Sequence, residues 1–135
     1  MSFANWNDSY SVKVQRLDDE HKRLFDIINQ LHEGMKAGRG KDVLQTVLDQ
    51  LLRYTEQHFK GEEGLLKGAG YPELTAHMAL HQQFVNKIKG FSKDFQSGAA
   101  AISVDVLEYL KNWLTEHIMG TDRQYSTTLT AAGIR

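Results

Sequence analysis

The chain has 135 residues, a length that fits one compact domain, and its net charge of −1 gives no broad attraction toward nucleic acid or an anionic membrane surface. It contains no cysteine, which excludes disulfides, zinc–thiolate sites and iron–sulfur clusters, so any metal must be held by nitrogen and oxygen ligands. No apolar run approaches the roughly 20 residues that a membrane span requires, and the N-terminus lacks the pattern of a secretory signal, so we expect a cytoplasmic protein without membrane insertion.

Residues 1–16 are predicted to form an arm that packs across the domain through Phe3, Trp6 and Tyr10. A helix is predicted at about residues 18–36, because apolar residues recur there at spacings of three and four. His21 lies on the apolar stripe of this helix, where a leucine would be ordinary.

The second predicted helix covers about residues 42–67, after a glycine-rich break. Its apolar stripe contains His58 and Glu62, four residues apart, so both side chains project from one face. Gly61 and Gly64 also lie inside this helix, and each should weaken it by roughly 1 kcal/mol relative to alanine.

The third predicted helix covers about residues 72–96, with Pro72 in its first turn and His77 and His81 on its apolar stripe. A further break at Gly98 precedes the fourth helix, predicted at about residues 104–122 with Ser103 as its N-cap. His117 lies on the apolar stripe of this last helix.

Four helices of this length joined by short turns predict an all-α fold, an antiparallel up-down-up-down four-helix bundle with the arm packed across it. The whole chain, residues 1–135, is expected to be a single domain. With no obvious exposed apolar stripe, a monomer is expected.

Five of the six histidines therefore fall on apolar stripes, spread over four helices. One buried histidine usually finds a hydrogen-bond partner in the core, but a cluster would leave several nitrogens unpaired at roughly 1–3 kcal/mol each. A metal removes that penalty by taking one nitrogen of each imidazole. Glu62 supports the same interpretation, because a buried carboxylate without a cationic partner is unfavourable unless it binds metal.

Asp122 is a less regular candidate. It follows His117 by five residues, about 140° around an ideal helix, so both can face one centre only if the helix widens or breaks. Gly120 would ease such a change, and we expect it near residues 119–121.

Five histidines, two bridging carboxylates and one bridging solvent oxygen fill all but one coordination position of two octahedral ions, and an open position is what dioxygen binding requires. Imidazole and carboxylate ligands suit iron, whereas zinc favours four ligands and calcium an all-oxygen shell. Helical di-iron oxidases typically use more carboxylates in Glu-x-x-His motifs, and this chain contains no such motif. The ligand set therefore favours binding of oxygen over its activation.

These motifs resemble the hemerythrin family, specifically its single-domain bacterial branch, the bacteriohemerythrins. The resemblance rests on motifs in this order: Trp6-Asn7-Asp8, Leu17-Asp18 with His21, His58-Phe59, Glu62-Glu63, Tyr71-Pro72 with His77 and His81, then His117 and Asp122. Glu20 departs from the pattern, because a glutamine is more usual before the first ligand histidine.

The resemblance implies two iron ions bridged by an oxo or hydroxo group, with Glu62 and Asp122 bridging the pair. It implies that one iron is held by three histidines, and that the other, held by two, takes up oxygen. The implied ligands of these irons are His77, His81 and His117 for the first, and His21 and His58 for the second. The implied apolar oxygen pocket consists of Phe59, Trp113, Leu114 and Ile118, and Tyr125 matches a family position near the site.

The expected function is reversible dioxygen binding for storage, transport or delivery, with an oxygen-consuming enzyme as a partner. A second hypothesis is an oxygen or redox sensor, although the chain carries no output domain. A third is a di-iron enzyme with peroxidase, oxidase, nitric oxide or iron-repair activity. We expect no catalytic residues, because the predicted pocket wall is apolar.

Overall fold

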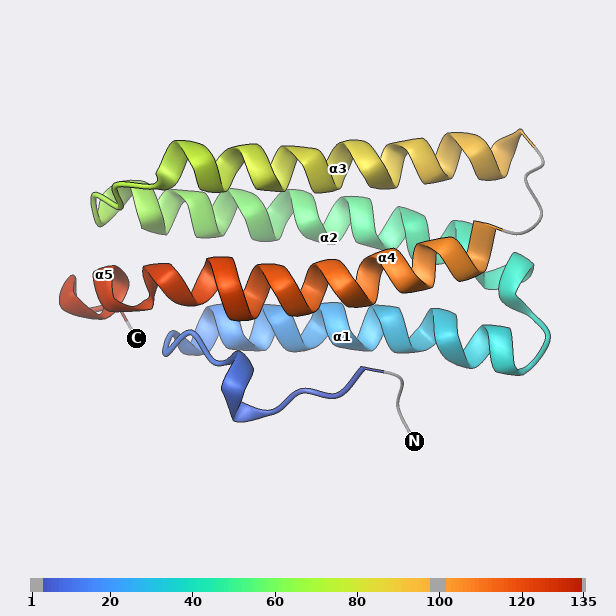
Figure 1. The fold of residues 1–135 in the computed structure, drawn as a ribbon, viewed down its shortest axis with the longest axis horizontal. Coiled ribbons are helices and arrows are strands. Elements are labelled where there is room, and N and C mark those ends of the chain that lie inside the picture. Colours follow the sequence, from blue (N-terminus) through green and yellow to red (C-terminus); the bar gives the residue numbers. More distant parts are fainter. Residues whose placement is uncertain (1–3, 98–101, 135) are drawn as a thin grey trace.

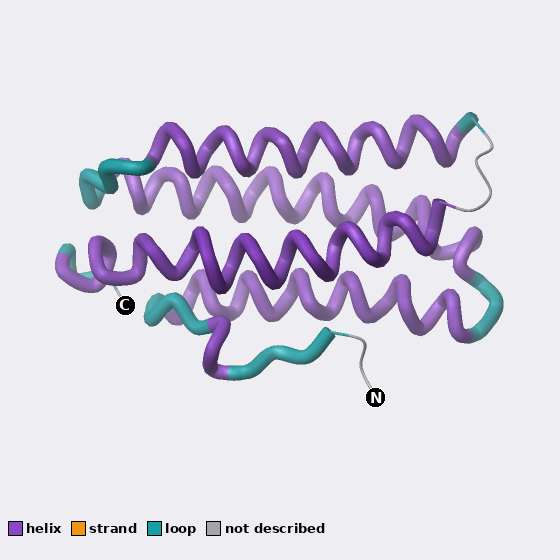
Figure 2. Tube along the Cα trace, in the orientation of Figure 1, coloured by secondary structure: helices purple, strands orange, loops and turns teal. Residues whose placement is uncertain are grey.

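The computed structural model describes residues 4–97 and 102–134, apart from the side chains of Lys41 and residues 102–104. Four helices run side by side in alternating directions: α1 (Gln15–Lys36), α2 (Gly40–Gly68), α3 (Leu74–Gln96) and α4 (Ile102–Glu116) (Figure 1). All regular secondary structure in the described residues is helical (Figure 2). The predicted all-α bundle is confirmed.

Several helix limits differ from the prediction. Helix α1 begins at Gln15, and the Asp18 carboxylate in its first turn accepts hydrogen bonds from Ser11 Oγ (2.7 Å) and from the backbone N–H of Val12 (2.8 Å). Pro72 lies in the turn before α3, which begins only at Leu74. Ser103 is already inside α4, so it is not the N-cap.

The fourth helix also ends differently. Regular α-helix stops at Glu116 and not at Asp122, and the chain continues as a π-helical turn, His117–Thr121, and a 3₁₀ turn, Asp122–Tyr125. A short helix, α5 (Ser126–Ala131), follows. The widened turn changes which side chains of this segment face the interior of the bundle.

The arm packs on the outside of the bundle, as predicted, but it runs along α1, and its aromatic side chains contact that helix (Figure 1). The rings of Trp6 and Tyr10 lie 5.8 and 4.9 Å from the ring of Phe25, measured between centroids. The Asn29 side chain exchanges two hydrogen bonds of 2.8 Å with the backbone of Ala4. Phe3 and Gly98, which took part in the predictions, lie outside the described residues.

The apolar core consists of two separate clusters along the bundle. The larger one fills the region between the four helices, and the smaller one contains Leu17, Leu66, Tyr71, Tyr125 and Leu129. Buried polar side chains lie between the clusters on α1, α2 and α3 and on the turns after α4. Within the described residues, no helix is long and apolar enough to cross a membrane.

Candidate metal centre

The side chains that the sequence predicts as metal ligands come together between the two apolar clusters. Helices α1, α2 and α3 and the turns after α4 each contribute at least one of them. All are at most 5% exposed: His21, His58, Glu62, His77, His81, His117 and Asp122.

These residues form two overlapping groups, in each of which the potential ligand atoms lie within 4.8 Å of one another. The larger group contains three histidines and both carboxylates: His77, His81, His117, Glu62 and Asp122. The smaller group contains His21, His58 and Glu62. The centre is therefore unequal, with three histidines on one side and two on the other.

Glu62 lies between the two groups and presents one oxygen to each. Its Oε1 is 2.6 Å from His77 Nε2 and 3.0 Å from His81 Nε2. Its Oε2 is 3.5 Å from His21 Nε2 and 3.4 Å from His58 Nε2. This is the arrangement that a carboxylate bridging two cations needs.

The two carboxylate oxygens of Asp122 also face different histidine groups. Its Oδ1 is 2.9 Å from His117 Nε2 and 3.2 Å from His77 Nε2, and its Oδ2 is 3.2 Å from His21 Nε2. The π-helical turn, His117–Thr121, produces this geometry, because a wider turn brings residues five apart onto one face. The predicted widening of the helix is confirmed.

The donor set fits a pair of cations. Six buried atoms of these side chains form no hydrogen bond within the described part of the chain: His21 Nδ1 and Nε2, His77 Nδ1, His81 Nε2, His117 Nε2 and Asp122 Oδ1. Buried polar atoms are normally paired, so this concentration of unpaired nitrogens calls for another partner. Imidazole and carboxylate donors together suit a transition metal such as iron.

Comparisons with known proteins agree with this geometry. Residues 12–129 match the family model described as the hemerythrin HHE cation binding domain. The chain belongs to the hemerythrin family. It is 32% identical to a bacteriohemerythrin of Methylococcus capsulatus, over 97% of this chain and all of the relative. It is also 32% identical to a myohemerythrin of Theromyzon tessulatum, over 92% of each chain.

A solved structure gives the same result. The crystal structure of a wild-type hemerythrin superimposes with a TM-score of 0.86 at 31% sequence identity, covering 96% of this chain and 99% of that one. The structural match therefore extends over nearly the whole bundle.

Electrostatics in the metal-free hemerythrin domain follow from this clustering. Burial alone would lower the pKa of His21, but the Asp122 and Glu62 carboxylates, 3.2 and 3.5 Å from its Nε2, outweigh burial and raise the pKa to about 10. The same balance raises the pKa of His77 to about 9. His21 and His77 therefore favour the protonated form at neutral pH in the metal-free protein.

The two carboxylates are affected in the opposite direction. Burial would raise the pKa of Glu62, but hydrogen bonds from the surrounding histidines hold that pKa well below its usual range. Burial and the Glu62 charge would likewise raise the pKa of Asp122, yet the close approach of His117, 2.9 Å away, and of His21 leaves it lowered. Both carboxylates therefore stay ionised at neutral pH.

Three hydrogen bonds between a ligand candidate and a neighbouring side chain were not predicted from the sequence. The Nδ1 atoms of His58 and His81 lie 2.6 Å from Glu20 Oε1 and 2.8 Å from Glu63 Oε2. The buried hydroxyl of Tyr125 donates to Glu62 Oε2 at 2.9 Å. Helical periodicity could not reveal these contacts, because each joins residues on different segments of the chain.

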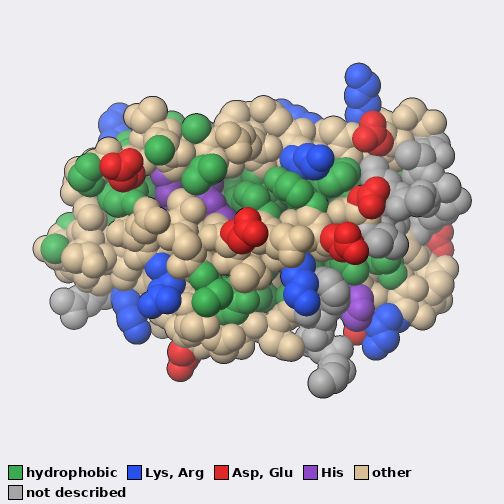
Figure 3. Space-filling model, viewed as in Figure 1, with side chains coloured by type: hydrophobic (Ala, Val, Ile, Leu, Met, Phe, Trp, Pro, Cys, Tyr) green, Lys and Arg blue, Asp and Glu red, His purple; other side chains and the backbone are tan. Residues whose placement is uncertain are grey.

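The predicted pocket residues pack beside the histidines. The Phe59 ring stacks on His81 with centroids 3.8 Å apart, and the Trp113 ring stacks on His117 at 4.3 Å. Leu114 and Ile118 are 2% and 1% exposed and belong to the larger apolar cluster. Figure 3 shows hydrophobic side chains around the visible edge of the histidines between α3 and α4.

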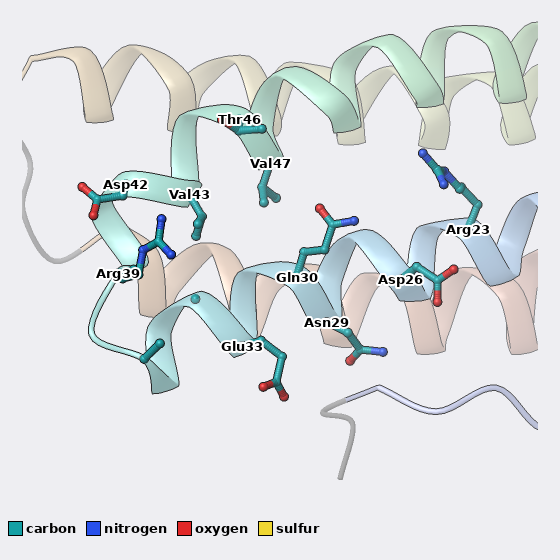
Figure 4. Close-up of a pocket in the computed structure, with 12 residues that line it drawn as sticks. Arg23, Asp26, Asn29, Gln30, Glu33, Arg39, Asp42, Val43, Thr46 and Val47 are labelled. Carbon is teal, nitrogen blue, oxygen red and sulfur yellow. The ribbon is translucent and has the colours of Figure 1, made fainter.

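A surface cavity also lies away from the histidines. It measures about 910 Å³ and is formed by the end of α1 and the beginning of α2, with Arg39, Asp42 and Val43 on the α2 side (Figure 4). Its side chains carry charges of both signs, and none of the clustered histidines lines it. This cavity is separate from the candidate centre.

Proposed function

We propose that this protein binds dioxygen reversibly at a di-iron centre and serves as an oxygen carrier or store in the cytoplasm. The observation that carries the proposal is the orientation of the Glu62 and Asp122 carboxylates. Each has one oxygen toward each histidine group. When bound, the iron pair supplies the electrons that dioxygen takes up and later returns.

The protein's own residues would hold the two ions unequally. His77, His81 and His117 would hold one ion, and His21 and His58 the other, with both carboxylates shared. Because the two-histidine side offers one imidazole fewer, an external ligand has room to bind there. The unequal groups in the structure support this assignment.

Water exclusion would keep the binding reversible. Phe59, Trp113, Leu114 and Ile118 would form the apolar wall, since an apolar surrounding keeps solvent protons away from a reactive centre. Tyr125 would hold Glu62 in its bridging orientation through the buried hydroxyl.

We assign the protein to oxygen binding and not to enzymatic turnover. The side chains packed on His81 and His117 are aromatic, and the carboxylates nearby are already engaged with histidines. Aromatic rings and carboxylates already engaged in this way are poorly placed to act as a general acid toward a substrate. We further propose that it acts as a monomer beside an oxygen-consuming enzyme.

The test is a cycle of reduction and oxygenation. The purified protein is reduced without oxygen, exposed to oxygen and then degassed, while its visible spectrum is recorded. An absorption band that appears with oxygen and disappears on degassing, over repeated cycles, supports the proposal. Irreversible oxidation at the first exposure, or a protein that takes up no iron, contradicts it.

A further inference from the structure

One of the clustered histidines is connected to the solvent through two charged side chains of α1. The Nδ1 atom of His58 donates to Glu20 Oε1 at 2.6 Å, and Arg16 Nε donates to Glu20 Oε2 at 3.0 Å. Exposure of these side chains rises outward, from 2% for His58 through 22% for Glu20 to 60% for Arg16. A surface cavity of about 180 Å³ is lined by all three residues.

Gly61 in α2 provides the space for the outermost group. A Cβ atom at this position would lie 2.5 Å from Arg16 Nη2, so the guanidinium occupies the place of the missing side chain. At Gly64, one turn further along the same helix, nothing lies within 4 Å of the corresponding point. The helix-weakening glycine at 61 is therefore matched to Arg16.

The other outer nitrogens are arranged differently. Glu63 accepts from His81 Nδ1 on the three-histidine side, but within the described residues it forms no ion pair with a lysine or arginine. His21 Nδ1 has no hydrogen-bond partner among them. On the two-histidine side, His58 alone is backed by a carboxylate, and that carboxylate is in turn paired with a cation.

We propose that Arg16, Glu20 and His58 form a charge relay that sets how firmly the two-histidine side retains oxygen. The proposal rests on the proposed di-iron function. A carboxylate that accepts from the outer N–H makes an imidazole a stronger metal ligand, and a stronger ligand favours the oxidised, oxygen-holding form. The positive charge of Arg16 partly offsets the negative charge of Glu20, and it therefore weakens the effect of Glu20 on His58. Glu20 and Arg16 are positioning residues that act only through His58.

The main test changes charge while keeping shape. Glu20→Gln retains an oxygen that can accept from His58 but removes the charge. We expect the oxygen dissociation rate to rise roughly fivefold, about 1 kcal/mol at 1.4 kcal/mol per factor of ten, and the midpoint potential of the iron centre to become more positive. Arg16→Gln should do the opposite, with slower release and a more negative potential.

The matched controls use an exposed ion pair in which Lys60 Nζ lies 3.4 Å from Glu56 Oε1. Lys60→Gln and Glu56→Gln make the same charge changes on α2. Both residues line a cavity with His81, on the three-histidine side, but within the described residues neither forms an ion pair with a clustered histidine. The two variants should leave both the release rate and the potential within about twofold of the parent protein, because exposed charges are strongly screened. Equal shifts in the controls would show a general effect of net charge and overturn the relay.

Gly61→Ala tests the space for the guanidinium. The new methyl group should displace Arg16 from Glu20, so this variant should shift the release rate and the potential in the direction of Arg16→Gln. Its metal-free form should be no less stable in urea, because alanine favours a helix more than glycine does.

Two results would overturn the relay. One is a Glu20→Gln protein with the parent's release rate and potential, and the other is a shift of Glu20→Gln and Arg16→Gln in the same direction. Because Arg16 is largely exposed, its variant keeps the test decisive even if Glu20→Gln folds poorly. If the parent holds iron but never releases oxygen, the proposed function fails, and the potentials still decide the relay.

Discussion

Truncation of Leu114 to alanine should separate the packing of the pocket wall from its protective role. Leu114 is 2% exposed and belongs to the larger apolar cluster. A small void of about 10 Å³ already adjoins it, next to Trp113 and Phe84, so the removed atoms extend an existing cavity. We expect a loss of about 3–4 kcal/mol in the free energy of unfolding, the middle of the range for such substitutions.

The assay combines stability with oxidation. Urea unfolding of the metal-free protein measures the energetic loss, which should appear in a thermal melt as a fall of roughly 10–15 °C. Iron content should stay near that of the parent, because Leu114 supplies no ligand atom. Oxidation of the oxygenated protein, followed by its visible spectrum, should accelerate as water reaches the enlarged cavity.

Leu44→Ala is the matched control, because Leu44 is equally buried but lies about 20 Å from His58 along α2. It should lower stability by a similar amount and leave the oxidation rate unchanged. If both variants oxidise equally fast, general loosening of the bundle explains the effect. Loss of iron from Leu114→Ala alone would refute the assignment of Leu114 to the wall.

Three further outcomes are expected. Tyr125→Phe removes a 2.9 Å hydrogen bond to the ionised Glu62, so urea unfolding should show a loss of about 1.5–3 kcal/mol with iron retained; an unchanged midpoint would contradict this role. Asp122→Asn removes a charge shared by both histidine groups, so elemental analysis should find less iron per chain than in the parent, and full occupancy would exclude Asp122 as a bridge. The metal-free protein should lose stability in urea as pH rises from about 6.5 toward 10, because the folded-state pKa values of His21 and His77 are about 10 and 9, against about 6.5 when unfolded. It should also lose stability below about pH 4, because the pKa values of Glu62 and Asp122 are lowered on folding, and a flat profile would contradict both statements.

The sequence predicted the bundle because periodicity within a helix determines which side chains share a face. The buried histidines could be predicted because each lies at a position of an apolar stripe where a leucine would be ordinary. Even the irregular Asp122 could be predicted, because its five-residue spacing from His117 requires a widened turn. Helix ends were less predictable. Pro72 favoured a start of α3 at residue 72, but the chain forms a turn there and α3 begins at Leu74. Ser103 favoured an N-cap, but α4 already begins at Ile102.

Contacts between helices could not be predicted in the same way. The Glu20–His58 hydrogen bond joins residues 38 apart, and its formation depends on the rotation of α1 against α2, which neither helix encodes alone. Gly61 shows the consequence. In the sequence it is only a residue that weakens α2, whereas in the structure it is the space that Arg16 occupies.

Metal-free folding and metal binding make opposite demands on this centre. Two ionised carboxylates and several histidines, all buried, leave six atoms unpaired within the described residues, so the interior is incomplete as a protein core. The apolar clusters on both sides must stabilise the bundle enough to keep the histidines in place before metal arrives. The positions are then preorganised, and the binding energy of the metal is not consumed in folding the chain. On this reasoning, substitutions in the apolar clusters should lower stability far more than metal affinity, whereas substitutions at Glu62 should lower both, because its charge also stabilises the metal-free fold.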